Sequence, residues 1–232
     1  MRVFATERPD AWEVQGRGEL QLAILVEQMR REGFELTVGK PMVLTKEIDG
    51  KIHEPVERVT IDVPDEYLGN VTQLLATRKG RMQNMTGSGW VRLDYLVPAR
   101  GLIGFRTQFM TDTRGTGVLN RVFHTWAPHK GAIPGRRAGV LISMENGVSV
   151  PYAIFNLEDR GKFFIGSQED VYQGMIIGEH NRENDLEVNP LKGKKLTNVR
   201  ASGTDEAVRL TTPIKMSLEE AIAYIDNDEL VE

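Results

Sequence analysis

Residues 56–97 read VERVTIDVPDEYLGNVTQLLATRKGRMQNMTGSGWVRLDYLV, and they carry the clearest periodic pattern in the chain. The first eight residues alternate, so that Val59, Ile61 and Val63 share one side of an extended segment. This alternation is typical of a strand with one apolar face. Pro64 ends the strand, and the two acids after it favour the first turn of a helix, whose dipole they complement. The segment therefore predicts a strand followed by a helix.

The continuation of this pattern predicts the arrangement of the whole middle region. Alternating runs at 81–85 and 90–97 flank a glycine-containing turn and predict a hairpin. A second helix is expected from about 101 to 110, and a last strand from 118 to 126. This order predicts a ferredoxin-like βαββαβ domain over residues 51–133, with a four-stranded antiparallel sheet and two helices on one face.

The regions on either side have different patterns. Residues 1–50 predict a partial α/β unit with one amphipathic helix from Glu19 to Arg31. Residues 134–232 predict a small, mostly β domain with a long basic loop and a terminal helix, which begins with a capping box between Ser217 and Glu220. The expected class is therefore α+β. The short strands of the last domain are expected at residues 139–143, 148–155, 162–165 and 175–178.

Composition excludes several classes of protein. The 232 residues include no cysteine, which excludes disulfide scaffolds, iron–sulfur clusters and cysteine nucleophiles. The 29 basic and 33 acidic residues give a net charge of −4, which excludes a globally basic nucleic-acid-binding protein but allows a local basic patch. The apolar run Leu22–Val26 is far too short to span a membrane, and no signal pattern is present. We therefore expect a cytoplasmic protein that binds neither DNA nor membranes.

Motifs for catalysis are missing from the sequence. It contains no G-x-x-x-x-G-K-[ST] phosphate loop, no G-x-G-x-x-G and no G-x-S-x-G. The four histidines lack the spacing of metal ligands on one helix or strand. They are His53, His124, His129 and His180. We therefore expect no catalytic residues, no metal and no bound cofactor in this chain.

One segment differs in charge from the rest of the chain. Residues 190–203 contain no acidic residue, and their polar side chains predict an extended loop. One interpretation is a solvated, lysine-rich loop. The other is a finger that binds the phosphates of folded RNA, without base stacking because it has no aromatic residue. The candidate RNA-binding residues of this basic segment are Lys192, Lys194, Lys195, Asn198, Arg200 and Ser202.

Two further groups of cations are secondary candidates for RNA contacts. Arg136 and Arg137 lie beside the expected boundary between the middle and last domains. Arg78, Lys79 and Arg81 lie at the end of the first helix of the ferredoxin-like domain. The alternative for both groups is that they are surface charges that maintain solubility.

Several stretches of the chain resemble the translational GTPases related to elongation factor G. GRGEL at 16–20 resembles a step in domain III of these proteins, and residues 64–82, from PDEYLG to RKGRM, resemble their domain V. PARGLIGFR at 98–106 and NPLKGKKLTNVRASGTDEA at 189–207 are similar to the TypA/BipA branch of that family. The resemblance covers essentially the whole chain and identifies it as the C-terminal part of a TypA/BipA family member.

This resemblance implies that GTP binding and ribosome binding lie in different domains of a longer protein. The family binds GTP and Mg in a G domain that lies N-terminal to the region seen here, so the chain itself is expected to be non-enzymatic and to hold no cofactor. The family is implied to bind the ribosome where elongation factor G binds, with domain V near large-subunit rRNA. Its C-terminal domain reaches towards the acceptor arm of the A-site tRNA, and the long loop of that domain matches residues 189–207.

The resulting hypothesis is a ribosome-binding region of a translational GTPase, monomeric, which supports ribosome assembly and translation under stress. Its partners are the ribosome, large-subunit rRNA and A-site tRNA. The alternative is a ferredoxin-like module that senses a small molecule or acts as a protein scaffold. A small-molecule site would need convergent polar groups in a pocket, and the sequence indicates none.

Overall fold

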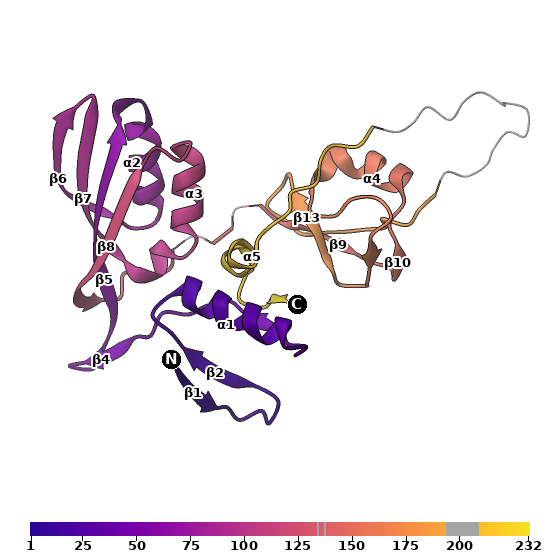
Figure 1. Ribbon diagram of the computed structural model, residues 1–232, viewed down its shortest axis with the longest axis horizontal. Coiled ribbons are helices and arrows are strands. Elements are labelled where there is room, and N and C mark those ends of the chain that lie inside the picture. Colours follow the sequence, from indigo (N-terminus) through magenta and orange to yellow (C-terminus); the bar gives the residue numbers. More distant parts are fainter. Residues whose placement is uncertain (134, 137, 194–208) are drawn as a thin grey trace, which may run out of the picture. The chain divides into compact units, whose positions relative to one another are not determined.

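The computed structural model describes residues 1–133, 135, 136, 138–193 and 209–232. These residues form two compact units (Figure 1). Unit 1 consists of Met1–Gly135 together with Ser217–Glu232, and unit 2 consists of Arg136–Met216. The last sixteen residues thus group with the first half of the chain. The division into parts 1–50, 51–133 and 134–232 stays a prediction.

Unit 1 is built on an antiparallel sheet with strand order β6-β7-β5-β8. The central strand β5 places Ile61 opposite Leu93 of β7 on one side and Leu119 of β8 on the other. A short strand, β4, pairs with the first residues of β5. The bounds are β4 (Lys46–Ile48), β5 (Lys51–Pro64), β6 (Arg81–Ser88), β7 (Trp90–Pro98) and β8 (Val118–Pro128).

Two helices cover one face of this sheet, α2 (Leu68–Thr77) and α3 (Phe105–Asp112). Short 3-10 turns at Asp65–Tyr67 and Ala99–Leu102 precede them. The expected helix at 101–110 is therefore divided, because Gly104 adopts a left-handed φ of 68° between the turn and α3. The order of elements and strands confirms the ferredoxin-like prediction. The fully buried core between helices and sheet includes Val59, Ile61, Val63, Val71, Leu75, Leu93, Leu102, Phe105 and Phe109.

The rest of unit 1 joins the first fifty residues to the last sixteen. The predicted helix is present as α1 (Glu19–Arg31), and α5 (Leu218–Tyr224) packs against it. Val26 of α1 and Ile222 of α5 are buried. The remaining strands form two pairs, β1 with β2 and β3 with β15. Their bounds are β1 (Arg2–Ala5), β2 (Trp12–Gln15), β3 (Val38–Gly39) and β15 (Leu230–Val231).

Unit 2 contains a second, smaller sheet with strand order β11-β13-β9-β14. β14 runs parallel to β9, and the other pairs are antiparallel. Two short strands, β10 and β12, pair separately. The bounds are β9 (Val140–Ser143), β10 (Gly147–Val148), β11 (Gly161–Phe163), β12 (Asp170–Val171), β13 (Ile176–His180) and β14 (Leu186–Val188).

One expected strand of unit 2 is wrong. Residues 148–155 were expected to be extended, but α4 (Pro151–Leu157) occupies most of this range, followed by a 3-10 turn at Glu158–Arg160. Pro151 stands in the first turn, where its fixed φ suits a helix and its missing N–H costs nothing. Ala153 and Ile154 are buried and Leu157 packs on the core, which is helical rather than alternate spacing. The α+β class is confirmed.

Candidate nucleic-acid interface

The basic segment begins at a turn that is firmly attached to unit 2. Pro190 is buried, and its carbonyl accepts a hydrogen bond from the Val150 N–H at 3.0 Å. The Asn189 side chain accepts from the Leu191 N–H at 2.9 Å, which forms a local turn. Lys192 follows this turn and is exposed. The other candidates of the segment lie outside the described residues, namely Lys194, Lys195, Asn198, Arg200 and Ser202.

Both described ends of the segment pack on the same hydrophobic core. Leu191 contacts the core of unit 2 before the segment, and Leu210 contacts it afterwards. Thr211 then donates from its N–H and its hydroxyl to one Glu158 carboxylate oxygen, at 2.7 and 2.6 Å. Residues 189–191 and 210–211 are therefore both fixed to the folded part of unit 2.

Two nearby cations have different environments. Lys215 donates to the Glu169 carboxylate at 2.7 Å, and this hydrogen bond lowers the pKa of that carboxyl. Arg209 is exposed on the returning side of the basic segment. Sequence analysis did not include Arg209 because two acidic residues separate it from the basic segment.

Of the two candidates at the start of unit 2, the structure describes only Arg136. Arg136 is half-buried and donates from Nε to the carbonyl of Ala138 at 2.9 Å. Its side chain therefore supports the local backbone, which does not favour a free phosphate-binding role. Arg137 lies outside the described residues.

Arg78 lies where α2 ends, and its guanidinium is directed into unit 1. It donates to the carbonyls of Gly101 and Ile103 at 2.7 and 2.9 Å, and to the Gln108 side chain at 3.0 Å. It also lies over the Phe105 ring, 5.5 Å from the centroid. Burial lowers the pKa of Arg78 below its ordinary value. The guanidinium fixes the turn before α3, so its geometry favours a structural role over an RNA contact.

The backbone at the end of α2 turns sharply at Lys79. Lys79 has a φ of 60°, a conformation that non-glycine residues adopt uncommonly. Gly80 follows and donates to the Leu75 carbonyl at 2.8 Å, where a Cβ atom would lie only 2.9 Å from that oxygen. The Lys79 ammonium donates to the carbonyl of Lys130, while Arg81 is exposed at the start of edge strand β6. Of the three neighbouring candidates, Arg81 is thus the most accessible.

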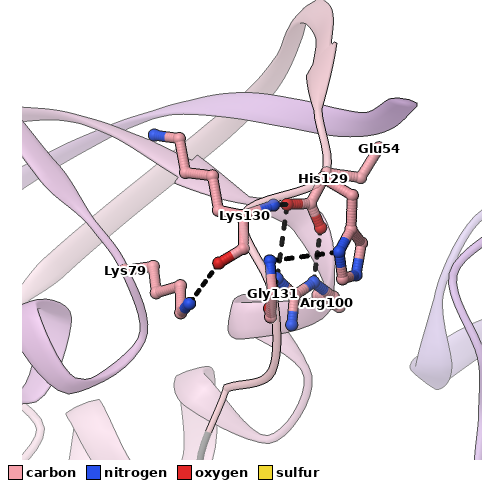
Figure 2. Close-up of polar contacts among 6 residues, drawn as sticks. All are labelled: Glu54, Lys79, Arg100, His129, Lys130 and Gly131. Atoms are coloured by element: carbon pink, nitrogen blue, oxygen red, sulfur yellow. Dashed lines mark hydrogen bonds and ion pairs between the residues drawn. The ribbon is translucent and has the colours of Figure 1, made fainter. Parts of the chain in front are cut away.

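Figure 2 shows that Lys79 belongs to a larger polar cluster. The Glu54 carboxylate is 1 % exposed and forms an ion pair with Arg100. It also accepts from the Lys130 N–H at 3.0 Å, and Arg100 donates to the Gly131 carbonyl at 2.5 Å. These contacts hold the backbone just after β8, where the chain leaves the sheet.

The pKa of Glu54 reflects two opposing effects. Burial raises it, but the hydrogen bonds from Arg100 and the Lys130 N–H, together with the charge of Arg100, lower it by more. The net pKa lies below that of an ordinary glutamate. Glu54 is therefore ionised at neutral pH.

Of this cluster, only Lys79 was a candidate from the sequence. Glu54 lies before the alternating stretch that predicted the strand. No local pattern links it to Arg100, which lies 46 residues away. Lys130 was also missed, although it is exposed and its ammonium points away from the cluster in Figure 2. A pairwise contact between distant residues gives no signal in a single sequence.

Two features are absent from residues 1–133, 135, 136, 138–193 and 209–232, namely a metal-binding cluster and a membrane-spanning helix. No group of three or more histidine, aspartate or glutamate side chains could hold a metal ion there. In the same ranges, no helix has both the length and the apolar character needed to cross a membrane.

Two family models match consecutive parts of the chain. Residues 51–137 match the family model for the elongation factor G C-terminus, and residues 138–232 match the model for the TypA/BipA C-terminal domain.

Similar curated proteins cover the whole chain. The protein named large ribosomal subunit assembly factor BipA is 57 % identical in Salmonella typhimurium, 56 % in Escherichia coli K12 and 52 % in Bacillus subtilis, in each case over 100 % of this chain. The chain spans 38–39 % of the length of these relatives. It therefore corresponds to a part of them.

Proposed function

This chain belongs to the TypA/BipA family of translational GTPases, and we propose that it is the region through which such a protein binds the ribosome. The proposed contacts are with large-subunit rRNA and with the acceptor arm of the A-site tRNA. The observation that supports them is the basic segment, which carries four cations and no acid between residues 190 and 203. The relatives named as large-subunit assembly factors support the ribosome as the partner.

The proposed mechanism is electrostatic. Lys192, Lys194, Lys195 and Arg200 neutralise RNA phosphates and release counterions, while Asn198 and Ser202 donate neutral hydrogen bonds. Leu191 and Leu210 pack on one core, which limits the positions that the segment has to sample before it binds. A limited search lowers the entropic cost of binding.

A second proposed contact lies on unit 1, at the end of α2. Arg81 and Lys130 are exposed and are proposed to contact phosphates directly. Arg78 and Lys79 donate to backbone carbonyls of unit 1, and we propose that they position this surface. Arg136 and Arg137 stay secondary candidates.

The remaining features of the proposal belong to the whole protein. GTP and Mg are proposed to bind in a G domain, and no step of nucleotide hydrolysis is assigned to residues of this chain, which has no phosphate-loop motif. Ribosome binding implies a cytoplasmic location, and we propose that the protein acts as a monomer. Its proposed role is in large-subunit assembly and in translation under stress.

Co-sedimentation with large ribosomal subunits tests this proposal. The chain is compared with a variant in which residues 190–203 are replaced by a neutral Gly/Ser sequence of equal length. We expect the wild type to pellet with subunits and the variant to stay in the supernatant. Equal pelleting of both proteins would contradict the role of the segment. Stabilisation by a small metabolite in a thermal-shift screen, without any pelleting, would favour the sensor alternative.

A further inference from the structure

The chain leaves the sheet of unit 1 through a short segment, His129–Gly131, whose backbone is bonded at every residue. The His129 N–H donates to the Ile52 carbonyl at 3.0 Å, and the Gly131 N–H donates to the His129 ring at 3.1 Å. The Lys130 N–H donates to Glu54, and its carbonyl accepts from Lys79. Such bonding is unusual for a connecting segment, since loops usually expose their backbone to water.

Three side chains from outside the segment bond to its backbone, and we call them the exit clamp: Glu54, Lys79 and Arg100. Glu54 is almost fully buried, so ionising it is costly unless Arg100 compensates the charge. Arg100 contacts both Glu54 and the Gly131 carbonyl, and so links β5 to the exit segment. Figure 2 shows the three side chains converging on the segment from different elements.

Arg100 is itself held in place. It lies in the 3-10 turn before α3, and Arg78 donates to the carbonyl of Gly101, the next residue. A Cβ atom on Gly101 would lie 2.6 Å from the Arg78 carbonyl, so the two backbones pack closely. The exit clamp is therefore anchored to α2 and to the turn before α3, and not only to flexible side chains.

We propose that Glu54, Lys79 and Arg100 are positioning residues that fix the backbone of residues 129–131 where it leaves the sheet of unit 1. They thereby hold the exposed Lys130 in place for the phosphate contact proposed above, without contacting RNA through Glu54 or Arg100. This inference rests on the proposed function for its effect on binding. The rigidity of the exit segment is inferred from the contacts of unit 1 alone and does not depend on the proposed function.

Two variants test the exit clamp, Arg100→Lys and Glu54→Gln. Lysine keeps the positive charge but lacks the planar fork that contacts Glu54 and Gly131 together. The matched control is Arg92→Lys, because Arg92 makes a similar two-bond pair with Asp62, at 2.7 and 2.9 Å, elsewhere in the same sheet. Asp62 and Arg92 have no bond to the exit segment among the described contacts.

The first measurement is amide hydrogen exchange of the chain. We expect exchange at Lys130 and Gly131 to rise at least tenfold in both clamp variants, while amides of β5 and β7 stay protected. Arg92→Lys should leave the exit segment unchanged. Unchanged exchange at Lys130 and Gly131 would overturn the clamp, and loss of protection throughout β5 and β7 in both variants would show a folding role instead.

The second measurement is affinity for large subunits as a function of salt. A positioning role predicts binding weakened several-fold, with the same salt dependence as the wild type, because no phosphate contact is lost. A further variant, Arg100→Gln, removes the charge, and a reduced salt dependence in this variant would overturn the proposal by making Arg100 a direct phosphate ligand. Unchanged affinity in Arg100→Lys and Glu54→Gln would overturn the link to binding. If the wild type itself fails to bind, the proposed function fails, while the exchange result still decides whether the exit clamp exists.

Discussion

Arg78 and Arg81 are two arginines three positions apart with opposite environments. Arg78 donates three hydrogen bonds within unit 1 and packs over Phe105, whereas Arg81 is exposed on an edge strand. Sequence analysis treated them alike because residue type and local charge do not show which guanidinium has acceptors nearby. The acceptors of Arg78 lie 23 to 30 residues away in the chain. Candidate cations can thus be found from sequence, but their roles depend on long-range contacts.

We expect this difference to appear in stability. Arg78→Ala should lower the free energy of unfolding by about 2–4 kcal/mol, because two partly buried carbonyls lose a charged donor and the contact with Phe105 is lost. Arg81→Ala should change it by less than about 0.5 kcal/mol, as is usual for an exposed residue. Urea unfolding of both variants measures this. Equal effects would mean that Arg78 does not anchor the turn before α3.

Two carboxylates of unit 1, the buried Glu54 and the half-buried Glu19, should respond to pH in opposite ways. The pKa of Glu54 is lowered in the fold, so its stabilisation is present above the unfolded glutamate pKa of about 4.3 and is lost as pH falls through the folded value. The pKa of Glu19 is raised, chiefly by burial, although the Gly104 N–H bond opposes this. Ionised Glu19 therefore costs stability at neutral pH, and this cost disappears on acidification.

Unfolding curves at neutral and acidic pH test these signs. Glu54→Gln should cost about 1–2 kcal/mol at neutral pH, because the neutral amide still accepts hydrogen bonds but no longer compensates the charge of Arg100, and should reduce the loss of stability on acidification. Glu19→Gln should increase that loss. The variant lacks the ionised Glu19 carboxylate, so protonation of this group no longer adds stability as the pH falls. The account is wrong on this point if both variants steepen the pH dependence.

At the level of elements, local patterns were sufficient where one face of an element is buried. Alternation in β5 and helical spacing in α1 and α2 predicted those elements, because burial imposes the same period on the sequence. The pattern failed at 148–155, where a short apolar run suits either a buried strand or a buried helix. The initial proline and the spacing of Ala153, Ile154 and Leu157 are the local signals that favour α4.

The capping box of α5 is a case where sequence predicted structure at atomic detail. The Ser217 hydroxyl accepts from the Glu220 N–H at 3.3 Å, and the Glu220 carboxylate accepts from the Ser217 N–H at 2.7 Å. Sequence analysis could not predict that this helix packs on α1, because no local signal specifies a partner almost two hundred residues away. Capping is local, whereas docking is not.

Because α5 spans only seven residues, its first turn should matter for the docking of the terminal segment. Ser217→Ala should lower the free energy of unfolding by about 1 kcal/mol, and Ser217→Thr, which keeps the hydroxyl, by much less. Amide exchange at Leu230 and Val231, in the strand paired with β3, should rise in the alanine variant alone. Equal exchange in the two variants would show that the Ser217 cap does not affect the docking of the terminal segment.

On the scale of the whole molecule, unit 2 is inserted between two parts of unit 1. The chain leaves unit 1 after Gly135 and returns at Ser217, and the returning segment pairs β15 with β3. Lys40 adds an ion pair with Asp226 at 3.5 Å. The ferredoxin-like sheet could be predicted because its six elements follow one another in sequence. The grouping of the last sixteen residues with the first fifty could not, since it depends on contacts between the two ends of the chain.

The central claim is that the basic segment, residues 190–203, binds RNA phosphates although the chain as a whole is acidic. The most direct measurement is the salt dependence of affinity for large ribosomal subunits, compared between the wild type and a variant in which Lys192, Lys194, Lys195 and Arg200 are all alanine. If four phosphates are engaged, the slope of log affinity against log salt should become less steep by about 3–4, and Lys192→Ala alone should remove about 1. Identical slopes and affinities for wild type and fourfold variant would contradict the claim.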